Sequence, residues 1–218
     1  MLKKNRYLFD DDLYNYFFAA VGILVAFFDF LTYPIFSVSM MLIFWYLLNL
    51  RELLKEKLSS VLKMMSGFLI SWGTGYIGMW AGKWIISDLL TGYGTISSAF
   101  NQISTYTLLN DNLNNANWQI TTLSAIRRNI STLGDGPIKI FLFAAIIFML
   151  YVLIKNRHYL TRRLILPYLF PAALPFLWYA AISGHSHIHA FFTYRNLAAT
   201  VFALACMSIE ILQKKKPT

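Results

Sequence analysis

The sequence is poor in charged residues and has a single cysteine, and both shortages exclude classes of protein. Only 13% of the 218 residues are charged, whereas 57% are hydrophobic and the mean hydropathy is +0.52. A soluble domain typically has about a quarter of its residues charged. The one cysteine, Cys206, excludes an internal disulfide and a cysteine-based metal site. Walker, Rossmann, nucleophile-elbow and metalloprotease motifs are also absent from the sequence.

The apolar residues gather in six runs, several of which approach the roughly 20 residues that cross a hydrocarbon layer. No signal-peptide cleavage pattern follows the first run, so we interpret that run as retained. The predicted fold class is all-α, a polytopic membrane helical bundle in one integral membrane domain, residues 1–218. We predict spans over residues 14–33, 34–50, 64–90, 138–154, 164–183 and 197–212.

The basic residues predict how the chain is oriented in the membrane. The formal net charge is +9, and fourteen of the 19 basic residues fall on one side of the predicted spans. Basic residues concentrate on the cytoplasmic side, so we predict a multi-pass cell-membrane protein with both termini in the cytoplasm. This role also excludes nucleic acid as the reason for the charge. The fourteen are Lys3, Lys4, Arg6, Arg51, Lys55, Lys57, Lys63, Lys155, Arg157, Arg162, Arg163, Lys214, Lys215 and Lys216.

Two segments outside the spans also have a helical pattern. Residues 51–63 indicate either an interfacial amphipathic helix or an extension of the third span. Residues 91–137 form a polar, outward-facing loop. Two short amphipathic helices on the membrane surface are predicted there by two periodic apolar sets: Ile96, Phe100, Ile103 and Tyr106, then Ile120, Leu123, Ile126 and Ile130.

Two spans carry unusual residues at every fourth position. In the third span these are small residues, which let another helix approach closely: Thr74, Gly78 and Gly82, with Gly73 and Gly75 nearby. In the fifth span they are prolines: Pro167, Pro171 and Pro175. Each proline removes a helical hydrogen bond, so the freed carbonyls need partners from neighbouring helices or from water.

Ionisable residues collect at the predicted outer ends of the spans. They are Asp29, Lys83, Asp88, His185, His187, His189 and Arg195. Such groups at membrane depth usually pair with one another or line a wet cavity, which makes them candidates for function.

The three histidines have several interpretations. In an extended segment all three would share one face, whereas on a helix only His185 and His189 would do so. Together they offer imidazoles to a transition metal, although a further ligand would be needed, and we do not predict a metal site. One or more of them is instead a candidate general acid or base. Ordinary interfacial hydrogen bonding is the third interpretation.

The other outer residues also have alternative interpretations. Arg195 suits a phosphate or carboxylate, or else it anchors the sixth span at the headgroups together with Tyr194. Asp29 is a candidate catalytic carboxylate or the ion-pair partner of Lys83. Lys83, which lies between tryptophans, is a candidate for substrate binding or simply extends its chain toward the headgroups.

Three segments carry a family resemblance: AFFDFLTYP, GYIGMWAGKW and SGHSHIHAFFTYRNLAATVFA. Together they resemble the C-terminal half of an uncharacterised family of bacterial polytopic membrane proteins of Gram-positive type. Members of that family have a longer N-terminal portion, and more often a tyrosine between the histidines that match residues 185–189. The resemblance implies a shortened member or one half of a split protein. The general architecture of this family is similar to that of lipid-linked sugar transferases and polymerases of the cell envelope.

Two functions are expected on these grounds. The first is a cell-envelope enzyme, or half of one, acting on a lipid-linked saccharide or phosphate at the outer leaflet. Asp29, His185 and His189 would act as acid or base, and Arg195 would hold phosphate. The second is a non-catalytic membrane subunit or a transporter component. No cofactor is predicted, and the expected partners are membrane lipids, a lipid-linked saccharide, and a separate N-terminal half or another membrane subunit.

Overall fold

The all-α fold class is confirmed by a computed structural model, which describes residues 11–28, 32–107, 121–134 and 136–214. These residues are almost entirely helical and contain no strand. Two short 3-10 turns, η2 (Arg157–Tyr159) and η3 (Tyr194–Asn196), join helices. The α-helices are α1 (Asp11–Phe28), α2 (Pro34–Leu48), α3 (Leu50–Leu53), α4 (Leu58–Thr91), α5 (Thr95–Tyr106), α6 (Thr122–Thr132), α7 (Gly136–Lys155), α8 (Arg162–Ala181), α9 (Ser183–Ile188), α10 (Ala190–Thr193) and α11 (Leu197–Lys214).

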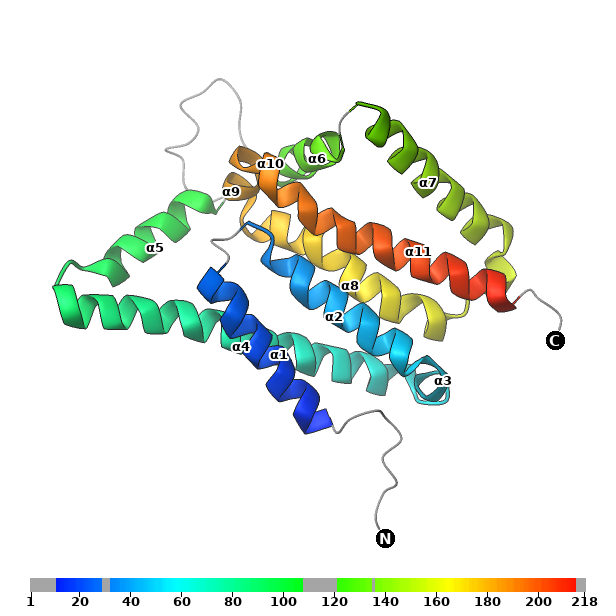
Figure 1. Ribbon diagram of the computed structural model, residues 1–218, viewed down its shortest axis with the longest axis horizontal. Helices are drawn as coiled ribbons and strands as arrows, with labels where there is room; N and C mark the ends of the chain where they lie inside the picture. Colours follow the sequence, from blue (N-terminus) through cyan, green and yellow to red (C-terminus); the bar gives the residue numbers. More distant parts are fainter. Residues whose placement is uncertain (1–10, 29–31, 108–120, 135, 215–218) are drawn as a thin grey trace, which may run out of the picture.

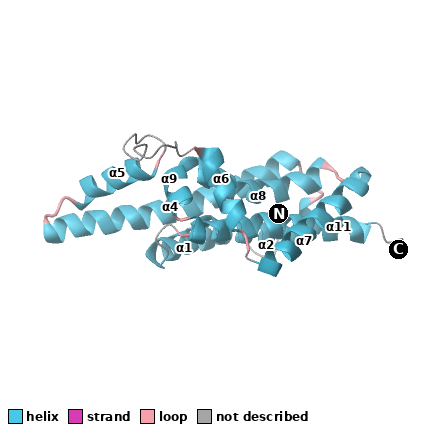
Figure 2. Ribbon diagram, turned by 90° about the horizontal axis from the view of Figure 1, so that it is seen from above, coloured by secondary structure: helices cyan, strands magenta, loops and turns pink. Residues whose placement is uncertain are grey.

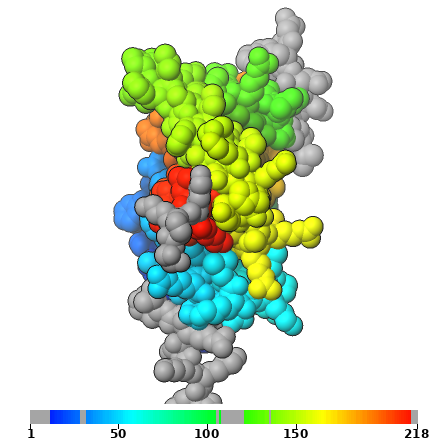
Figure 3. Space-filling model, turned by 90° about the vertical axis from the view of Figure 1, so that its right-hand side faces the viewer, coloured from blue at the N-terminus to red at the C-terminus, as the bar shows by residue number. Residues whose placement is uncertain are grey.

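The helices form an elongated molecule with two distinct ends (Figure 1, Figure 2). One end, which we call the α3 end, holds the α2–α3 turn, the connection between α7 and α8, and the last turn of α11 (Figure 1, Figure 3). The opposite end, which we call the α9 end, holds α6, α9, α10 and the start of α11 (Figure 1). Helices α4 and α5 project beyond it as an arm.

Three described helical stretches are long and apolar enough to cross a membrane: Gly136–Lys155, Arg162–Ala181 and Ala190–Lys214. Two shorter apolar helices, Asp12–Phe28 and Pro34–Leu48, accompany them. Only 11% of the apolar window of α7 is buried inside the protein, so most of its side chains face outward. A helix with that pattern is stable next to lipid rather than water, which agrees with the predicted membrane localisation.

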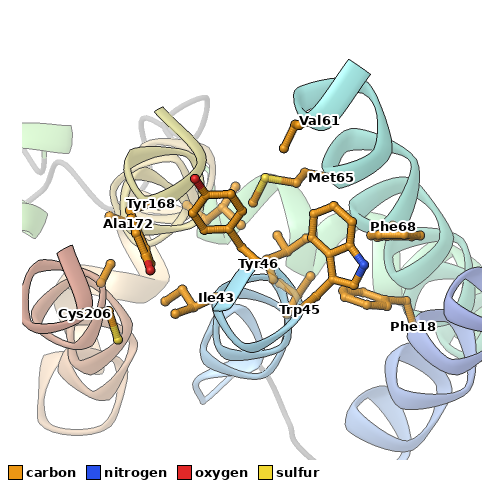
Figure 4. Close-up of a cluster of buried hydrophobic side chains, with 14 of the residues drawn as sticks. Phe18, Ile43, Trp45, Tyr46, Val61, Met65, Phe68, Tyr168, Ala172 and Cys206 are labelled. Atoms are coloured by element: carbon orange, nitrogen blue, oxygen red, sulfur yellow. The ribbon is translucent and has the colours of Figure 1, made fainter. Parts of the chain in front are cut away.

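Aromatic rings form much of the main core, where α1, α2, α4, α8 and α11 meet (Figure 4). Phe18 and Phe68 stack with ring centroids 5.0 Å apart, and Trp45 meets Phe68 edge-on at the same distance. Toward α8, Tyr46 meets Tyr168 edge-on at 4.9 Å. Helix α2 therefore lies between the α1–α4 pair and α8, and it packs rings against both.

Helices α1 and α4 approach each other so closely that only glycine fits at two positions. A Cβ on Gly75 would overlap the carbonyl oxygen of Ala19 and lie 2.9 Å from its carbonyl carbon. A Cβ on Gly22 would likewise overlap the carbonyl oxygen of Trp72. These neighbours are backbone atoms, which cannot turn away as a flexible side chain would, so the two glycines determine the distance between the helices.

The predicted stripe of small residues on α4 lies outside this contact. Within the described residues, no heavy atom of a neighbouring element lies within 4 Å of a Cβ built on Gly78 or Gly82. Thr74 is exposed, and its hydroxyl donates to the carbonyl of Ile70 in its own helix. The glycine that packs against another helix is therefore Gly75, one position after the start of the stripe.

One carbonyl that a proline frees in helix α8 finds its partner on another helix. Pro167 leaves the carbonyl of Arg163 without its helical donor, and the buried hydroxyl of Tyr46 in α2 donates to it at 2.9 Å. Farther along α8, the hydroxyl of Thr200 in α11 donates to the carbonyl of Ala172 at 2.9 Å, although the residue four positions later is Phe176 and not a proline. A neighbouring helix thus supplies the partner of one freed carbonyl, that of Arg163.

Replacing Tyr46 by phenylalanine is expected to destabilise the fold by about 1–2 kcal/mol, because a freed carbonyl in α8 loses its hydrogen bond. Tyr168→Phe provides a matched control. Its hydroxyl is also buried but has no partner among the described residues, so its removal is expected to be neutral or stabilising. Thermal unfolding of both variants in detergent measures the difference. Equal destabilisation by the two substitutions would show that the Tyr46 hydrogen bond contributes nothing.

Candidate functional site at the α9 end

A buried polar network fastens helix α6 to the rest of the α9 end. Asn129, which is fully buried, donates from Nδ2 to the carbonyl of Ala125 at 2.9 Å and to that of Ser186 in α9 at 2.8 Å. Its Oδ1 accepts from the hydroxyl of Thr193 in α10 at 2.7 Å. Tyr179 of α8 donates its hydroxyl to the carbonyl of Thr193 at 2.8 Å. Four helices are therefore tied together by directional bonds.

His187 completes this network from α9. One nitrogen of Arg128 lies 3.0 Å from Nε2 of His187, and the hydroxyl of Ser124 lies 3.3 Å from Nδ1. A guanidinium can only donate, so Nε2 must be the accepting, unprotonated nitrogen, and the ring proton lies on Nδ1. The Ser124 oxygen then accepts this proton, because the hydroxyl itself donates to the carbonyl of Thr121 at 2.8 Å.

The surroundings of His187 favour its neutral form. Its side chain is buried, and burial lowers its pKa below the ordinary value for histidine. The positive charge of Arg128 lowers the pKa further, and the contact with Ser124 opposes these two effects. His187 is therefore neutral near pH 7, in agreement with the tautomer that the hydrogen bonds require.

The other two histidines share a different face. Residues 183–188 are helical, which selects the second of the two predicted arrangements: His185 and His189 have ring centroids 4.7 Å apart, while His187 faces α6. Within the described chain, no three His, Cys, Asp or Glu side chains are placed to hold a metal ion. A cation already occupies the space next to Nε2 of His187. The geometry therefore gives no support to a metal site made of all three histidines.

Arg195 is an exposed cation in the 3-10 turn η3. Its guanidinium carbon lies 5.5 Å from the ring centre of Tyr33 and 5.8 Å from that of Phe192. It makes no hydrogen bond or ion pair with any described residue, so its donors are available to a ligand. The turn is held in place by the next residue, Asn196, whose buried Oδ1 accepts from the backbone N–H of Phe36 at 3.0 Å.

Tyr194 is adjacent to Arg195 in sequence but packs into the protein. It is half-buried against a small hydrophobic cluster of Leu133, Tyr179 and Leu197. This packing gives Tyr194 a structural role at the start of α11.

Lys83 of helix α4 reaches the last turn of helix α1. Its Nζ donates to the carbonyls of Ala26 at 3.0 Å and Phe27 at 3.2 Å, and it lies 4.8 Å from the ring centre of Phe27. The last carbonyls of a helix lack helical partners and carry partial negative charge, so a lysine there stabilises the helix end. Asp29, its predicted ion-pair partner and a candidate catalytic residue, lies outside the described residues, so both roles of Asp29 stay predictions.

Asp88 supports the turn into the projecting arm. Its carboxylate accepts from the backbone N–H groups of Thr95 and Ile96, the latter at 3.0 Å, at the start of α5. Between them Gly92 and Gly94 both have φ +66°, a left-handed conformation that glycine adopts without strain. The hydrogen bonds from the start of α5 thus explain the position of Asp88, and no ligand is needed to explain it.

The sequence interpretation missed the α6 side of this site. Ser124, Arg128 and Asn129 were not among the candidates, although their spacing of four and five residues places them near one face of a helix. The apolar periodicity of the segment instead pointed to Leu123, which is 74% exposed. The helix turns Ala125 and Asn129 inward, and Ile126 is half-buried against Leu133, Tyr179 and Leu197.

No family model matches the chain, and no curated protein or solved structure matches it. The fold and the site define a class only: an all-helical protein with helices suited to a membrane and a polar, partly buried site at one end. The predicted family resemblance therefore stays a prediction, and the function must be inferred from the geometry of the chain itself.

Proposed function

We propose that the chain is a six-span membrane protein with both termini in the cytoplasm and the α9 end outside. The support comes from where the basic residues lie. Segments with clustered basic residues meet at the α3 end: the α3–α4 connection, the α7–α8 connection and the end of α11 (Figure 3). Such clusters are retained on the cytoplasmic side.

We propose further that the α9 end binds the phosphate of a lipid, such as a lipid-linked saccharide, at the outer leaflet. The observation that carries this proposal is Arg195, an exposed guanidinium with free donors between two aromatic rings. A planar guanidinium can give two parallel hydrogen bonds to a phosphate. The exposed rings of Tyr33 and Phe192 suit the adjoining lipid or sugar, because aromatic side chains favour the membrane interface.

The histidines supply the catalytic part of this proposal. His189 is half-buried and stacks at an angle on the buried ring of His185, so one imidazole is reachable and the other supports it. A reachable imidazole suits proton transfer. Asp29 stays a proposed base. We assign Lys83 to the end of α1 rather than to a substrate, because its ammonium group is already used there.

The test uses two probes that differ only in the phosphate: dodecyl phosphate and dodecanol. Arg195→Gln is expected to weaken binding of dodecyl phosphate about 10- to 100-fold, the equivalent of charge-assisted hydrogen bonds worth about 1.5–3 kcal/mol. Binding of dodecanol is expected to stay unchanged. Titration of the purified protein in lipid nanodiscs measures both affinities.

Arg127→Gln is the matched control for this titration. Arg127 is an exposed cation on α6 that makes no hydrogen bond or ion pair with a described residue, so its loss removes the same charge without removing the proposed phosphate contact. An equal loss of affinity in the two variants would mean that dodecyl phosphate responds only to overall charge. Unchanged affinity in Arg195→Gln would contradict the proposal.

The second candidate function is that of a non-catalytic subunit or transporter component. It is favoured by α4, where Gly78 meets no described neighbour and the side chains of Ile70 and Ile77 on the same helix are exposed. Small residues beside apolar ones suit contact with another membrane helix. On this alternative, Gly78→Leu removes assembly with a second membrane protein, whereas Arg195→Gln leaves that assembly intact.

A further inference from the structure

The α3 end carries more positive charge than its own acidic residues balance. Nine exposed lysines and arginines lie on three segments that meet there: residues 51–63, residues 155–163 and the last turn of α11 (Figure 3). The acidic residues on these segments and on α11 are Glu52, Glu56 and Glu210. Positive charge is therefore in excess on this surface.

Most of these cations are not neutralised by the chain itself. Lys55 is the one of the nine that forms an ion pair with a described residue, Glu52, at 2.9 Å. Six make neither a hydrogen bond nor an ion pair with any described residue: Arg51, Lys57, Lys63, Arg157, Arg162 and Lys214. Their donors are available to an anionic partner.

The cations lie where apolar helices end. Lys155 is the last residue of α7, Arg162 is the first of α8, and Lys214 is the last of α11. These three helices belong to the stretches that are long and apolar enough to cross a membrane. In a bilayer the ends of such helices lie at the headgroups, which is the depth of the lipid phosphates.

Exposed apolar side chains continue from these cations into the helices. Ile154 adjoins Lys155, Leu166 lies one turn after Arg162, and Leu212 lies in the last turns of α11. A phospholipid combines a phosphate with acyl chains, so one lipid matches both a cation and its apolar neighbour. A soluble acidic protein would match the charge alone and leave the apolar side chains uncovered.

The α7–α8 connection holds its cations on a fixed support. Buried Asn156 donates from Nδ2 to the carbonyl of Val152 at 2.8 Å, and its own carbonyl accepts from the backbone N–H of Tyr159 at 3.0 Å. Tyr159 packs against the main core. Arg157 and Arg162 therefore project from an ordered backbone, which lowers the entropy cost of binding a ligand between them.

We propose that the α3 end binds anionic phospholipids, whose phosphates contact the cations of the α7–α8 connection and whose acyl chains cover the apolar residues beside them. Each lysine or arginine near an anionic membrane surface strengthens binding about fivefold, the equivalent of about 1 kcal/mol. This lipid site is separate from the phosphate site proposed at the α9 end and does not depend on it.

Native mass spectrometry of the full chain in detergent tests the lipid site with two probes: dioctanoyl phosphatidylglycerol, which is anionic, and dioctanoyl phosphatidylcholine, which is zwitterionic. The wild-type protein is expected to bind the anionic lipid at least about tenfold more tightly, and Arg162→Gln is expected to lower this ratio about fivefold. Arg157→Gln combined with Arg162→Gln is expected to lower it further. Both lipids contain a phosphate, so a phosphate site at Arg195 would accept both and leave the ratio unchanged.

Arg127→Gln is the matched control for the lipid ratio. Arg127 is an exposed arginine at the α9 end that makes no hydrogen bond or ion pair with a described residue, so its loss is expected to keep the wild-type ratio. The proposal is overturned if the wild-type protein binds both lipids equally, or if Arg127→Gln lowers the ratio as much as Arg162→Gln. Displacement of phosphatidylglycerol by polyglutamate at equal concentration of charge would also overturn it, and would assign the α3 end to an acidic protein.

Discussion

Gly75→Ala is expected to destabilise the protein by about 3 kcal/mol, the upper end of the usual cost of overpacking, although it adds one methyl group. The added Cβ would overlap the carbonyl oxygen of Ala19, and the other nearby atoms are also backbone atoms of Ala19. No rotamer change relieves that overlap, so helices α1 and α4 must separate. Separation would loosen the stacked rings of Phe18 and Phe68, which connect the same two helices. Thermal unfolding in detergent and the yield of monodisperse protein measure the loss.

Gly78→Ala is the control for this prediction. It makes the same chemical change three residues later in the same helix, where no neighbouring element of the described chain lies within 4 Å of the new Cβ. Alanine favours a helix over glycine by about 1 kcal/mol, so Gly78→Ala is expected to be neutral or slightly stabilising. Equal stability of Gly75→Ala and Gly78→Ala would mean that α1 does not pack on α4 as described.

The helical architecture could be predicted because it follows from local patterns. Long apolar runs require helices wherever backbone groups cannot bond to water, and each predicted span contains a helix in the structure. The boundaries were less predictable. Residues 51–63, for which two interpretations stood open, are divided between α3 and the first turns of α4, which begins at Leu58.

Helix–helix contacts were harder to predict because spacing alone does not say which face meets a neighbour. The sequence pointed to Gly78 and Gly82, while Gly75 packs against α1 from a different side of the same helix. The stripe and the contact residue differ by only a few positions. The deciding information is the position of Ala19 and Gly22, which lie more than 50 residues earlier in the chain.

The candidate site was partly predictable for a similar reason. Polar residues near the ends of apolar runs are easily found, and this rule selected the histidines, Lys83 and Arg195. Their roles depend on partners that are distant in sequence: Lys83 bonds to Ala26, and His187 bonds to Arg128. No local pattern encodes these pairs. The sequence also left open whether residues 183–188 are helical. Because they are, His185 and His189 share one face of the segment and His187 lies on another.

The orientation in the membrane underlies the proposal of phosphate binding at the outer leaflet, and the single cysteine makes it easy to measure. Cys206 is buried, so Cys206→Ala provides a cysteine-free background with one substitution. Two exposed serines then serve as matched reporters: Ser131 of α6 at the α9 end and Ser59 of α4 at the α3 end. Each is replaced by cysteine in a separate protein.

Labelling of intact cells with a membrane-impermeant maleimide is the most direct test of the account. Ser131→Cys is expected to react fully in intact cells, whereas Ser59→Cys is expected to react only after the membrane is permeabilised, because basic segments stay in the cytoplasm. A Ser131→Cys protein that reacts only after permeabilisation, or a Ser59→Cys protein that reacts in intact cells, would contradict an outward-facing α9 end.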